Sequence, residues 1–367
     1  MRFMALACVG WMAVVSAETV PDASHVIDRE SLDRWAEKYR GWHYYPEHVL
    51  PPSPKDGLDF EKTDCPLVFQ HGGVWRMFYT GFDGRGYQTA LATSEDLVHW
   101  TPKGLVMGYG KPGAYDHGGV TFGGLLFDSY DVRAPKTLKR WQGKYWALYG
   151  CYPRQGGYEL RPGAEGVAWS EDGERWQRLS DDRPSLSVDG ASPWEKDCIY
   201  QPWLVEHDGR FWDFYNAANG SVEQMGLAQS RDMVQWKRHS ENPILRNGPS
   251  GSYDEQFCSD GKVFRDPDLS EDGSDVWVML YFGVGKGGAH IMVAFSRDLY
   301  HWTAHPEPLY KAGGHPKGLD AKYAHKISLV HNPANDTFYL FYCAVGKQGR
   351  GIGLITSKPL EVPPKGD

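Results

Sequence analysis

Apolar and polar residues alternate in a pattern that recurs five times between residues 60 and 358. Each copy contains a short apolar run, a polar turn and an aromatic run that ends in tyrosine. Alternation with a period of two places successive side chains on opposite faces of a strand, so each copy predicts a pair of antiparallel strands. The closing tyrosines, which fall 70, 66, 66 and 61 residues apart, are Tyr79, Tyr149, Tyr215, Tyr281 and Tyr342.

Four copies continue into a Ser-x-Asp-x-x-x-Trp segment, which predicts a turn followed by an outer strand. The aspartate of such a turn accepts backbone N–H groups, and we expect the tryptophan to pack between neighbouring copies. A motif that recurs in this way indicates scaffold rather than a single site. The four segments run from Ser94 to Trp100, from Ser170 to Trp176, from Ser230 to Trp236 and from Ser296 to Trp302.

The repeat predicts the fold class. Strand repeats of this length bury their aromatic faces only by stacking on one another. We therefore predict an all-β protein, a five-bladed β-propeller over residues 60–367. The fifth copy keeps only a stub of the turn at 356–359, so we expect an N-terminal strand within 42–50 to complete that blade. Residues 25–40 predict a short amphipathic helix, and an extension of residues 18–59 would hold both elements.

The first 17 residues predict a signal peptide, and hence a secreted or periplasmic protein. A basic start leads into an apolar run that ends in the small-residue exit Val15-Ser16-Ala17. The run is shorter than the roughly 20 residues that span a bilayer, so no membrane partner is expected. Removal of this segment leaves five cysteines, an odd number without a C-x-x-C pair, so the sequence predicts neither a disulfide pairing nor a zinc site.

Composition and charge limit the classes of molecule that the protein is expected to bind. The formal net charge of −8 disfavours nucleic acid and acidic membrane surfaces. Aromatic residues make up 14% of the sequence, with 15 Trp and 21 Tyr, a content that suits packed sheets and sugar-binding surfaces. A carbohydrate is therefore the expected partner.

Candidate site residues come from the positions at which the blades differ. In the sequence alignment of the five blades, the innermost strands start with unlike polar groups. Several such groups that meet on one axis are costly to bury without a function, although single aspartates before strands are also common in turns. The starting residues are Asp64, Arg133, Gln201, Asp260 and His325, and they are flanked by the carboxylates of Asp131, Asp197, Asp254, Glu255 and Asp320.

At these residues the sequence resembles the five-bladed propeller glycosidases, a clan of arabinanases and β-xylosidases, invertase-type fructosidases and 3,6-anhydro-galactosidases. The shared features are the blade start with its aromatic strand, as in 133–149, and the Ser-x-Asp turns. The resemblance covers about residues 60–358 and implies hydrolysis of O-glycosyl bonds in oligosaccharides or polysaccharides. Lys136 stands where arabinanase-type enzymes carry aspartate, which argues against arabinanase or xylosidase activity. The site pattern is closer to that of the 3,6-anhydro-galactosidases.

This resemblance implies roles for four residues. Asp64 would act as the general base toward water, and His325 would act as the general acid for the leaving oxygen. Asp260 would orient His325 and hold up its pKa, with Glu255 as the substitute acid. Acid and base on opposite walls of a propeller funnel leave room for a water molecule, so we expect an inverting and exo-acting enzyme.

Further residues near the blade starts are candidates for substrate binding. The aromatic ones offer faces on which a sugar ring stacks. The cationic ones would bind an anionic sugar, or would instead neutralise the turn aspartates. These candidates are Arg133, Lys136, Tyr200, Gln201, Trp203 and Lys326. The chemistry requires no cofactor, and a structural calcium ion in the central channel is the one metal that the sequence allows for.

Two other classes of function remain open at this point. A non-catalytic carbohydrate-binding propeller would carry near-identical sites in every blade, which the unequal blade starts disfavour. A sialidase-like or lyase-type carbohydrate-active enzyme is the second alternative. The Ser-x-Asp turn resembles the sialidase Asp-box, although its tryptophan comes one residue early.

Overall fold

The computed structural model describes residues 25–271 and 273–360, and its regular structure consists almost entirely of β-strands. The prediction of an all-β protein is confirmed. The predicted signal segment, residues 1–17, lies outside the described residues. No helix of the described part is long and apolar enough to cross a bilayer. The helical elements of that part are helix α1 (Arg29–Glu37) and the 3₁₀ turns Pro193–Glu195 and Pro267–Leu269.

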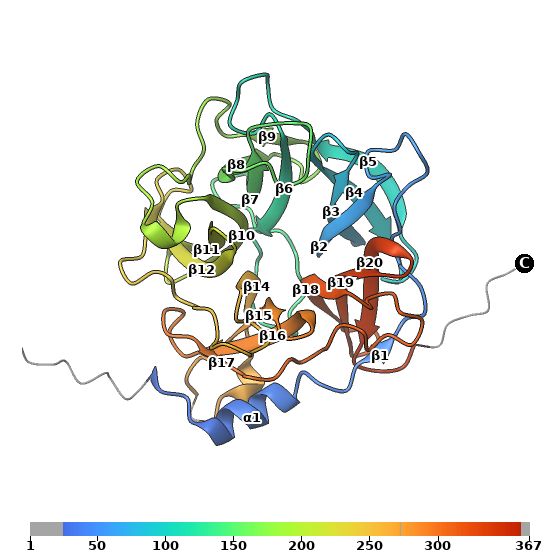
Figure 1. Ribbon diagram of the computed structural model, residues 1–367, viewed down its shortest axis with the longest axis vertical. Coiled ribbons are helices and arrows are strands. Elements are labelled where there is room, and N and C mark those ends of the chain that lie inside the picture. Colours follow the sequence, from blue (N-terminus) through green and yellow to red (C-terminus); the bar gives the residue numbers. More distant parts are fainter. Residues whose placement is uncertain (1–24, 272, 361–367) are drawn as a thin grey trace, which may run out of the picture.

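The described strands pair in five antiparallel groups that follow one another along the sequence. In Figure 1 the groups surround a common centre, and β2, β6, β10, β14 and β18 are their innermost strands. The groups are β2 (Lys62–His71), β3 (Val74–Phe82), β4 (Tyr87–Ser94) and β5 (Thr101–Met107); β6 (Gly119–Leu125), β7 (Tyr145–Tyr152), β8 (Ala164–Ser170) and β9 (Trp176–Arg178); β10 (Cys198–His207), β11 (Arg210–Asn219), β12 (Val222–Ser230) and β13 (Lys237–Arg238); β14 (Phe257–Arg265), β15 (Trp277–Gly285), β16 (Gly288–Ser296) and β17 (Thr303–Ala304); and β18 (Tyr323–Asn332), β19 (Thr337–Gly346), β20 (Gly349–Thr356) and β1 (His43–Tyr44).

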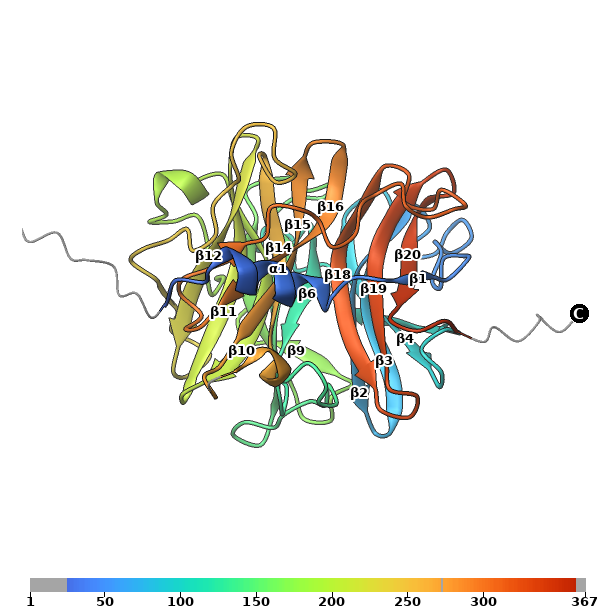
Figure 2. The ribbon, with the colours of Figure 1, turned by 90° about the horizontal axis from the view of Figure 1, so that it is seen from below.

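The first and last strands of the described sequence share one sheet. Strand β1 pairs antiparallel with β20, so an N-terminal segment supplies the outermost strand of the last group. The backbone N–H of Val49 donates to the carbonyl of Ile352 at 2.8 Å and extends this pairing. Helix α1 lies outside the fourth group, where Trp35 packs on Phe295 with ring centroids 5.5 Å apart (Figures 1 and 2).

Each innermost strand contains a bulge at an equivalent place. The register shifts by one residue in β2, β6, β10, β14 and β18. In four of these strands the bulge holds a non-glycine residue with positive φ: Cys65, Gln201, Asp260 and Lys326. A bulge bends its strand and re-aims the neighbouring side chains. In every innermost strand except β6, the bulge therefore changes the direction of charged and polar side chains.

The innermost strand of the second group is β6, not a strand that starts at Arg133 as the sequence alignment assumed. Its Gly123 and Gly124 lie against the backbone of β10, where an added Cβ would come within 2.4 Å of the Pro202 oxygen and 2.5 Å of the Leu204 nitrogen. Only glycine permits this approach.

Residues 126–139, which we call the crossing segment, connect β6 to the start of β7 and contact other innermost strands. Backbone hydrogen bonds of 2.8 Å join Val132 to Arg265 of β14 and Lys136 to Gln70 of β2. Lys139 forms an ion pair of 2.6 Å with Glu206 of β10. Since these partners lie at or next to the carboxyl ends of their strands, the crossing segment lies at that end of the sheet groups.

The Ser-x-Asp turns have the structure predicted for them. In the first turn the Asp96 carboxylate accepts the backbone N–H groups of Val98 and His99 at 2.9 and 2.8 Å. The tryptophan at the end of the second turn, Trp176, meets Phe78 of the first group edge to face, with centroids 6.0 Å apart. The prediction that these tryptophans pack between neighbouring groups is confirmed.

The closing tyrosines are buried, and three of them bond to carboxylates that precede the innermost strand of their own group. The hydroxyl of Tyr281 donates to Asp254 at 2.9 Å, and that of Tyr342 donates to Asp320 at 3.2 Å. Tyr215 donates in the same way to Glu195 at 2.8 Å. The carboxylates of Asp254 and Asp320 therefore belong to the scaffold, which is the structural interpretation that the sequence left open.

The cysteines of the described residues are buried thiols that form no disulfide: Cys65, Cys151, Cys198, Cys258 and Cys343. Burial is the main cause that raises the pKa of the Cys65 thiol to about 11 and that of Cys198 to about 12. Both thiols are therefore protonated at neutral pH, which argues against either as a nucleophile.

Candidate active site

A cavity of about 330 Å³ lies at the end of the molecule where the innermost strands begin. Its wall includes Phe257 and Tyr323, the first residues of β14 and β18, so it is at the opposite end of the strands from the crossing segment. Cavities of this size suit small ligands. The charged residues and histidine of its wall are Glu159, Glu223, His325, Lys326 and Arg350, and aromatic rings come from Tyr158, Tyr200, Phe257, Phe282 and Tyr323.

Asp64 lies beneath this wall and forms a buried ion cluster with Lys326 and Arg350. Its Oδ2 atom lies 3.0 Å from Nζ of Lys326 and also accepts a hydrogen bond from Arg350. Burial acts to raise the pKa of Asp64, but the charges of Arg350 and Lys326 prevail and hold it well below its usual value. Oδ2 of Asp64 thus accepts from two cations and Oδ1 from the backbone N–H of Cys65, and the residue is not part of the cavity wall. This geometry does not suit the predicted general base.

His325 lines the cavity but has no proton to donate into it. Its Nδ1 atom lies 3.0 Å from the carbonyl oxygen of Cys343, and its Nε2 atom lies 3.2 Å from the guanidinium of Arg350. Nδ1 therefore carries the proton, and Nε2 accepts. Burial first, and then the charge of Arg350, lowers the pKa of His325 to about 3. The predicted role as general acid is wrong for this arrangement, because the acid must be protonated.

Asp260 pairs with Lys262 rather than with His325. Its Oδ1 atom lies 2.6 Å from Nζ of Lys262, and both side chains are buried. The predicted role in orienting His325 is therefore wrong. Glu255, the predicted substitute acid, accepts the backbone N–H of Gly251 at 2.7 Å and is not part of the cavity wall.

Two predicted substrate-binding residues lie in the protein interior. Trp203 donates its indole N–H to the carbonyl of Val263 at 2.8 Å, and Gln201 donates to the sulfur of Cys65 at 3.2 Å. Neither contributes to the cavity wall. Tyr200 and Lys326 do line it, as expected from the sequence.

Arg133 and Lys136 lie in the crossing segment, away from the cavity. Arg133 forms ion pairs with Asp268 and Asp336 at 3.3 and 2.9 Å. Lys136 donates to the carbonyl of Asp131 at 3.1 Å, and burial lowers its pKa to about 8. Their predicted contact with the substrate is wrong for this cavity, because both residues follow β6 in the crossing segment and neither is part of the cavity wall.

Glu223 is the titratable residue of the wall that the sequence reasoning missed. It is 5% exposed, and its Oε2 atom accepts a hydrogen bond of 2.8 Å from the hydroxyl of Ser259. Burial raises the pKa of Glu223 to about 7; a hydrogen bond with Tyr200 lowers it, and the charge of Glu159 raises it. Near neutral pH this carboxyl group holds its proton about half of the time.

A signal for Glu223 exists in the third strand of each group. In each group, one residue of the third strand pairs with the closing tyrosine. The residue three positions before it in the sequence occupies an equivalent place in all five groups. Two of these residues, Glu223 and Arg350, supply charge to the cavity, and Ala289 lines it as well. The unequal positions are thus Tyr87, Gly163, Glu223, Ala289 and Arg350. These residues belong to the third strands or come just before them, whereas the residues predicted from the sequence come from the starts of the innermost strands.

Glu159 brings a second carboxylate to the wall from the loop between β7 and β8. Its side chain lies 3.8 Å from Nζ of Lys326 and forms an ion pair with it. Its backbone has a φ of 48°, a left-handed conformation that is costly for residues other than glycine. Such conformations persist where the surroundings hold them, often at functional sites.

The groups at the centre do not fit the structural calcium ion that the sequence allowed for. The carboxylates of Asp64 and Asp260 are each bonded to a lysine ammonium group. Calcium requires several oxygen ligands. Arg350 also donates toward Asp64, His325 and the sulfur of Cys343, so a guanidinium already provides positive charge among these three side chains.

Two solved structures are similar to this protein over most of its length. One, a complex named for BT0996 and RGII, is 26% identical, with a TM-score of 0.75 over 91% of the present sequence and 96% of its own. A structure named "Glycoside hydrolase" is 27% identical, with a TM-score of 0.75 over 92% and 98% of the two sequences.

Curated relatives match over shorter stretches. A 1,2-beta-oligomannan phosphorylase of Thermoanaerobacter sp. (strain X514) is 25% identical over 214 residues, which is 52% of the present sequence. The match with the phosphorylase spans 61% of the length of that relative. A second relative is an A type blood N-acetyl-alpha-D-galactosamine deacetylase of Flavonifractor plautii, and the match with it spans 34% of its length.

A family model matches more than half of the sequence. The model of the glycosyl hydrolases family 32 N-terminal domain covers residues 132–319, from the crossing segment through the fourth strand group to the loop before β18. Together with the two similar structures, this match supports the resemblance to propeller glycosidases that the sequence indicated. The protein belongs to the glycosyl hydrolases family 32 N-terminal domain family and shares its fold with a solved glycoside hydrolase.

Proposed function

We propose that this enzyme cleaves an O-glycosidic bond with Glu223 as the general acid and Glu159 as the second carboxylate. The observation that carries the proposal is the buried Glu223 carboxyl group, whose pKa is raised to about 7 in the wall of the cavity. Glycosidases place two carboxyl groups around the scissile bond and keep one of them protonated by its environment. Glu223 meets the requirement for the protonated partner that His325 does not.

Glu159 is suited to the complementary role. Its side chain forms an ion pair with Lys326, and its loop places it in the same cavity wall as Glu223. It would activate a water molecule as a base, with inversion at the anomeric carbon, which is the course that we propose. Lys326 and Arg350, fixed from below by Asp64, would hold this wall of the cavity in shape.

The shape and charge of the cavity favour a terminal, neutral sugar. A volume of about 330 Å³ is at the lower end of the range for ligand pockets, roughly 300–1,000 Å³, which suits one terminal unit and exo action. The sequence allowed for an anionic sugar, but Arg133 and Lys136 lie away from the cavity, and Lys326 is already paired. Because one similar structure is named for a complex with RGII, we propose an RGII-type oligosaccharide as the substrate class.

The test is to incubate the purified protein with RGII oligosaccharides and with a wider panel of glycans, and to follow the released sugar and its anomer by NMR. We expect release of one terminal sugar with inverted configuration. Addition of inorganic phosphate should not change the product; a sugar phosphate would instead show phosphorolysis, the activity named for one curated relative. Binding without turnover would favour the non-catalytic alternative, and an unsaturated product would favour a lyase.

We also propose how the protein is organised. The five strand groups would be the five blades of one closed propeller over residues 60–367, with β1 from the extension of residues 18–59 as the outer strand of the fifth blade. Residues 1–17 would be removed on export to the periplasm or the medium. N-terminal sequencing of the protein produced in a secreting host tests the cleavage, and a first residue before position 18 would contradict it.

A further inference from the structure

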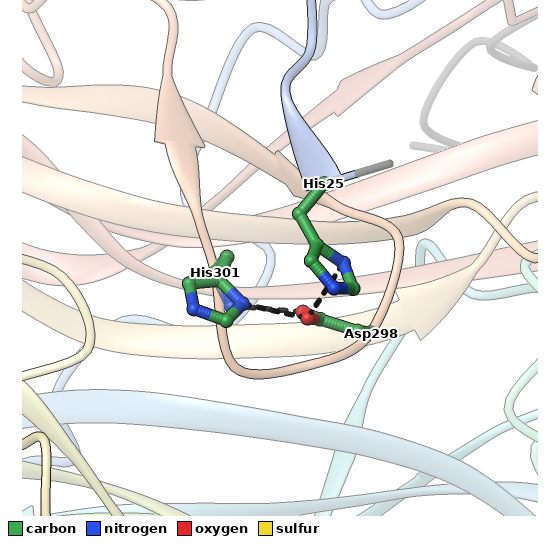
Figure 3. Close-up of side chains that lie close together, drawn as sticks. All are labelled: His25, Asp298 and His301. Atoms are coloured by element: carbon green, nitrogen blue, oxygen red, sulfur yellow. Dashed lines mark hydrogen bonds and ion pairs between the residues drawn. The ribbon is translucent and has the colours of Figure 1, made fainter. Parts of the chain in front are cut away.

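Two histidines and an aspartate meet at the outer surface of the fourth strand group (Figure 3). His25 precedes helix α1, and Asp298 and His301 belong to the Ser-x-Asp turn after β16. The Nδ1 atoms of His25 and His301 lie 2.9 and 2.7 Å from the same atom, Oδ2 of Asp298. The two imidazole rings are stacked, with centroids 4.9 Å apart.

The turn holds the Asp298 carboxylate in a fixed orientation. Its Oδ1 atom accepts the backbone N–H groups of Tyr300 and His301 at 2.9 and 2.8 Å and the hydroxyl of Ser296 at 3.0 Å. Oδ2 is therefore the oxygen that faces both imidazoles. Hydrogen bonds that fix a carboxylate in this way are the outer-shell support found around metal ligands in proteins.

The other three Ser-x-Asp turns provide an internal comparison. In the first, His99 bonds to Asp96 at 2.6 Å in the same way, but no second histidine joins them among the groups of potential metal ligands in the described residues. The second and third turns carry Arg175 and Gln235 at the equivalent position. The third ligand of the fourth turn arrives because helix α1 packs on that group and brings His25 with it.

We propose that His25, Asp298 and His301 bind a divalent transition-metal ion, such as Zn²⁺, through the two Nδ1 atoms and Oδ2 of the aspartate. Imidazole nitrogen and carboxylate oxygen are the donors that zinc takes in proteins, and water can complete the coordination. The three donor atoms all lie within 4.8 Å of one another. Since the histidine side chains are 32% and 55% exposed, an ion can enter from solvent. The ion would fasten the segment before α1 to the turn, far from the proposed catalysis.

The test is isothermal titration of the metal-free protein with ZnCl₂, with variants chosen from the comparison of the turns. We expect one saturable site in the wild type, and affinity at least about tenfold weaker in His25→Ala and in His301→Ala, because each removes a ligand. His99→Ala, which removes the equivalent histidine of the first turn, should bind as the wild type does. Far-ultraviolet circular dichroism would check that each variant is folded.

A second measurement counts the ligands directly. The electron paramagnetic resonance spectrum of the Cu²⁺-loaded protein should show coupling to two imidazole nitrogens in the wild type and to one in His25→Ala. Equal zinc affinity of wild type and His25→Ala, or an equal loss in His99→Ala, would overturn the proposal. Absence of saturable zinc binding in the wild type would overturn it as well.

Discussion

Ser259 donates a hydrogen bond of 2.8 Å to Oε2 of Glu223, across the boundary between the fourth and third strand groups. The direction of this bond is fixed by its neighbours. The backbone N–H of Asp260 donates to the side-chain oxygen of Asn216, whose amide nitrogen in turn donates to Ser259. The serine proton must then point to Glu223. The bond favours the charged form of Glu223 and partly opposes the effect of burial on its pKa.

Glu223→Gln should lower kcat by about 10²- to 10⁴-fold on a natural glycoside, the usual contribution of a general acid. Folding should persist, since the amide keeps the shape of the side chain. Aryl glycosides with good leaving groups should be affected much less. The matched control is Glu255→Gln, which changes a glutamate outside the cavity wall and should retain wild-type activity. Equal losses in both variants would remove the basis for the assignment.

The pH dependence of kcat/KM should show an alkaline limb near pH 7. Glu223 must be protonated to act as an acid, so activity falls as pH rises through its pKa of about 7. Ser259→Ala removes a hydrogen bond to the charged form and should move this limb to higher pH, whereas a purely structural role of Ser259 would lower activity at every pH without a shift. A limb that stays in place in Ser259→Ala would contradict the role of this bond.

Asp64→Asn should destabilise the fold, because Lys326 and Arg350 would lose the buried carboxylate that they share. Breaking such a buried pair costs about 3–5 kcal/mol. We expect the free energy of unfolding in urea to fall by that amount. The double variant Asp64→Asn with Lys326→Met should recover part of the loss, because it removes one of the two unpaired cations. If Asp64→Asn keeps full stability but loses turnover, Asp64 is the base that the sequence predicted.

His325 should make the protein less stable as the pH falls below 6.5. The folded-state pKa of about 3 is below the ordinary value, so the stabilisation is complete above pH 6.5 and is lost as pH falls toward 3, while only the unfolded state takes up the proton. Between pH 6.5 and 5 the loss should reach about 2 kcal/mol. His325→Gln cannot titrate and should show a flatter dependence in urea unfolding at each pH. Parallel curves for the two proteins would contradict the shifted pKa.

Arg133→Ala should leave KM unchanged for neutral and anionic oligosaccharides alike. Arg133 is about half exposed and pairs with Asp268 and Asp336, away from the cavity. Exposed ion pairs contribute at most about 1 kcal/mol, so only a small decrease in Tm is expected. Michaelis–Menten kinetics on a neutral and an anionic substrate would check this. A selective increase in KM for the anionic one would restore the role that the sequence assigned to Arg133.

The sequence predicted the repeat because the aromatic strands are built alike, each closing on a buried tyrosine such as Tyr281. It failed at β6, where close approach of the backbones requires Gly123 and Gly124 and leaves no blade-start pattern to align. In β18 the position with positive φ is Lys326 and not His325. A one-residue change of register along a strand turns a side chain to the other face, so no alignment of types alone could assign these two residues.

Glu223 was missed for a different reason. Its pKa depends on burial, on Ser259 from another strand group and on Glu159 from a loop, and none of these is visible in local sequence. Tyr200 and Lys326, which stand at the starts of innermost strands, do line the cavity, and their role in substrate binding stays a prediction. Residues on the third strand or on loops lay outside that comparison.

The ion cluster beneath the cavity has a consequence for how the enzyme becomes active during synthesis. Asp64 is bonded to residues that follow it by 262 and 286 positions, Lys326 and Arg350. Contacts so distant in sequence form late in folding, because a long loop must close before they are gained. A nascent polypeptide that lacks β20 therefore lacks the ion pair between Asp64 and Arg350 beneath the cavity. Catalytic competence should appear as one late step, after the last strand group has joined the first.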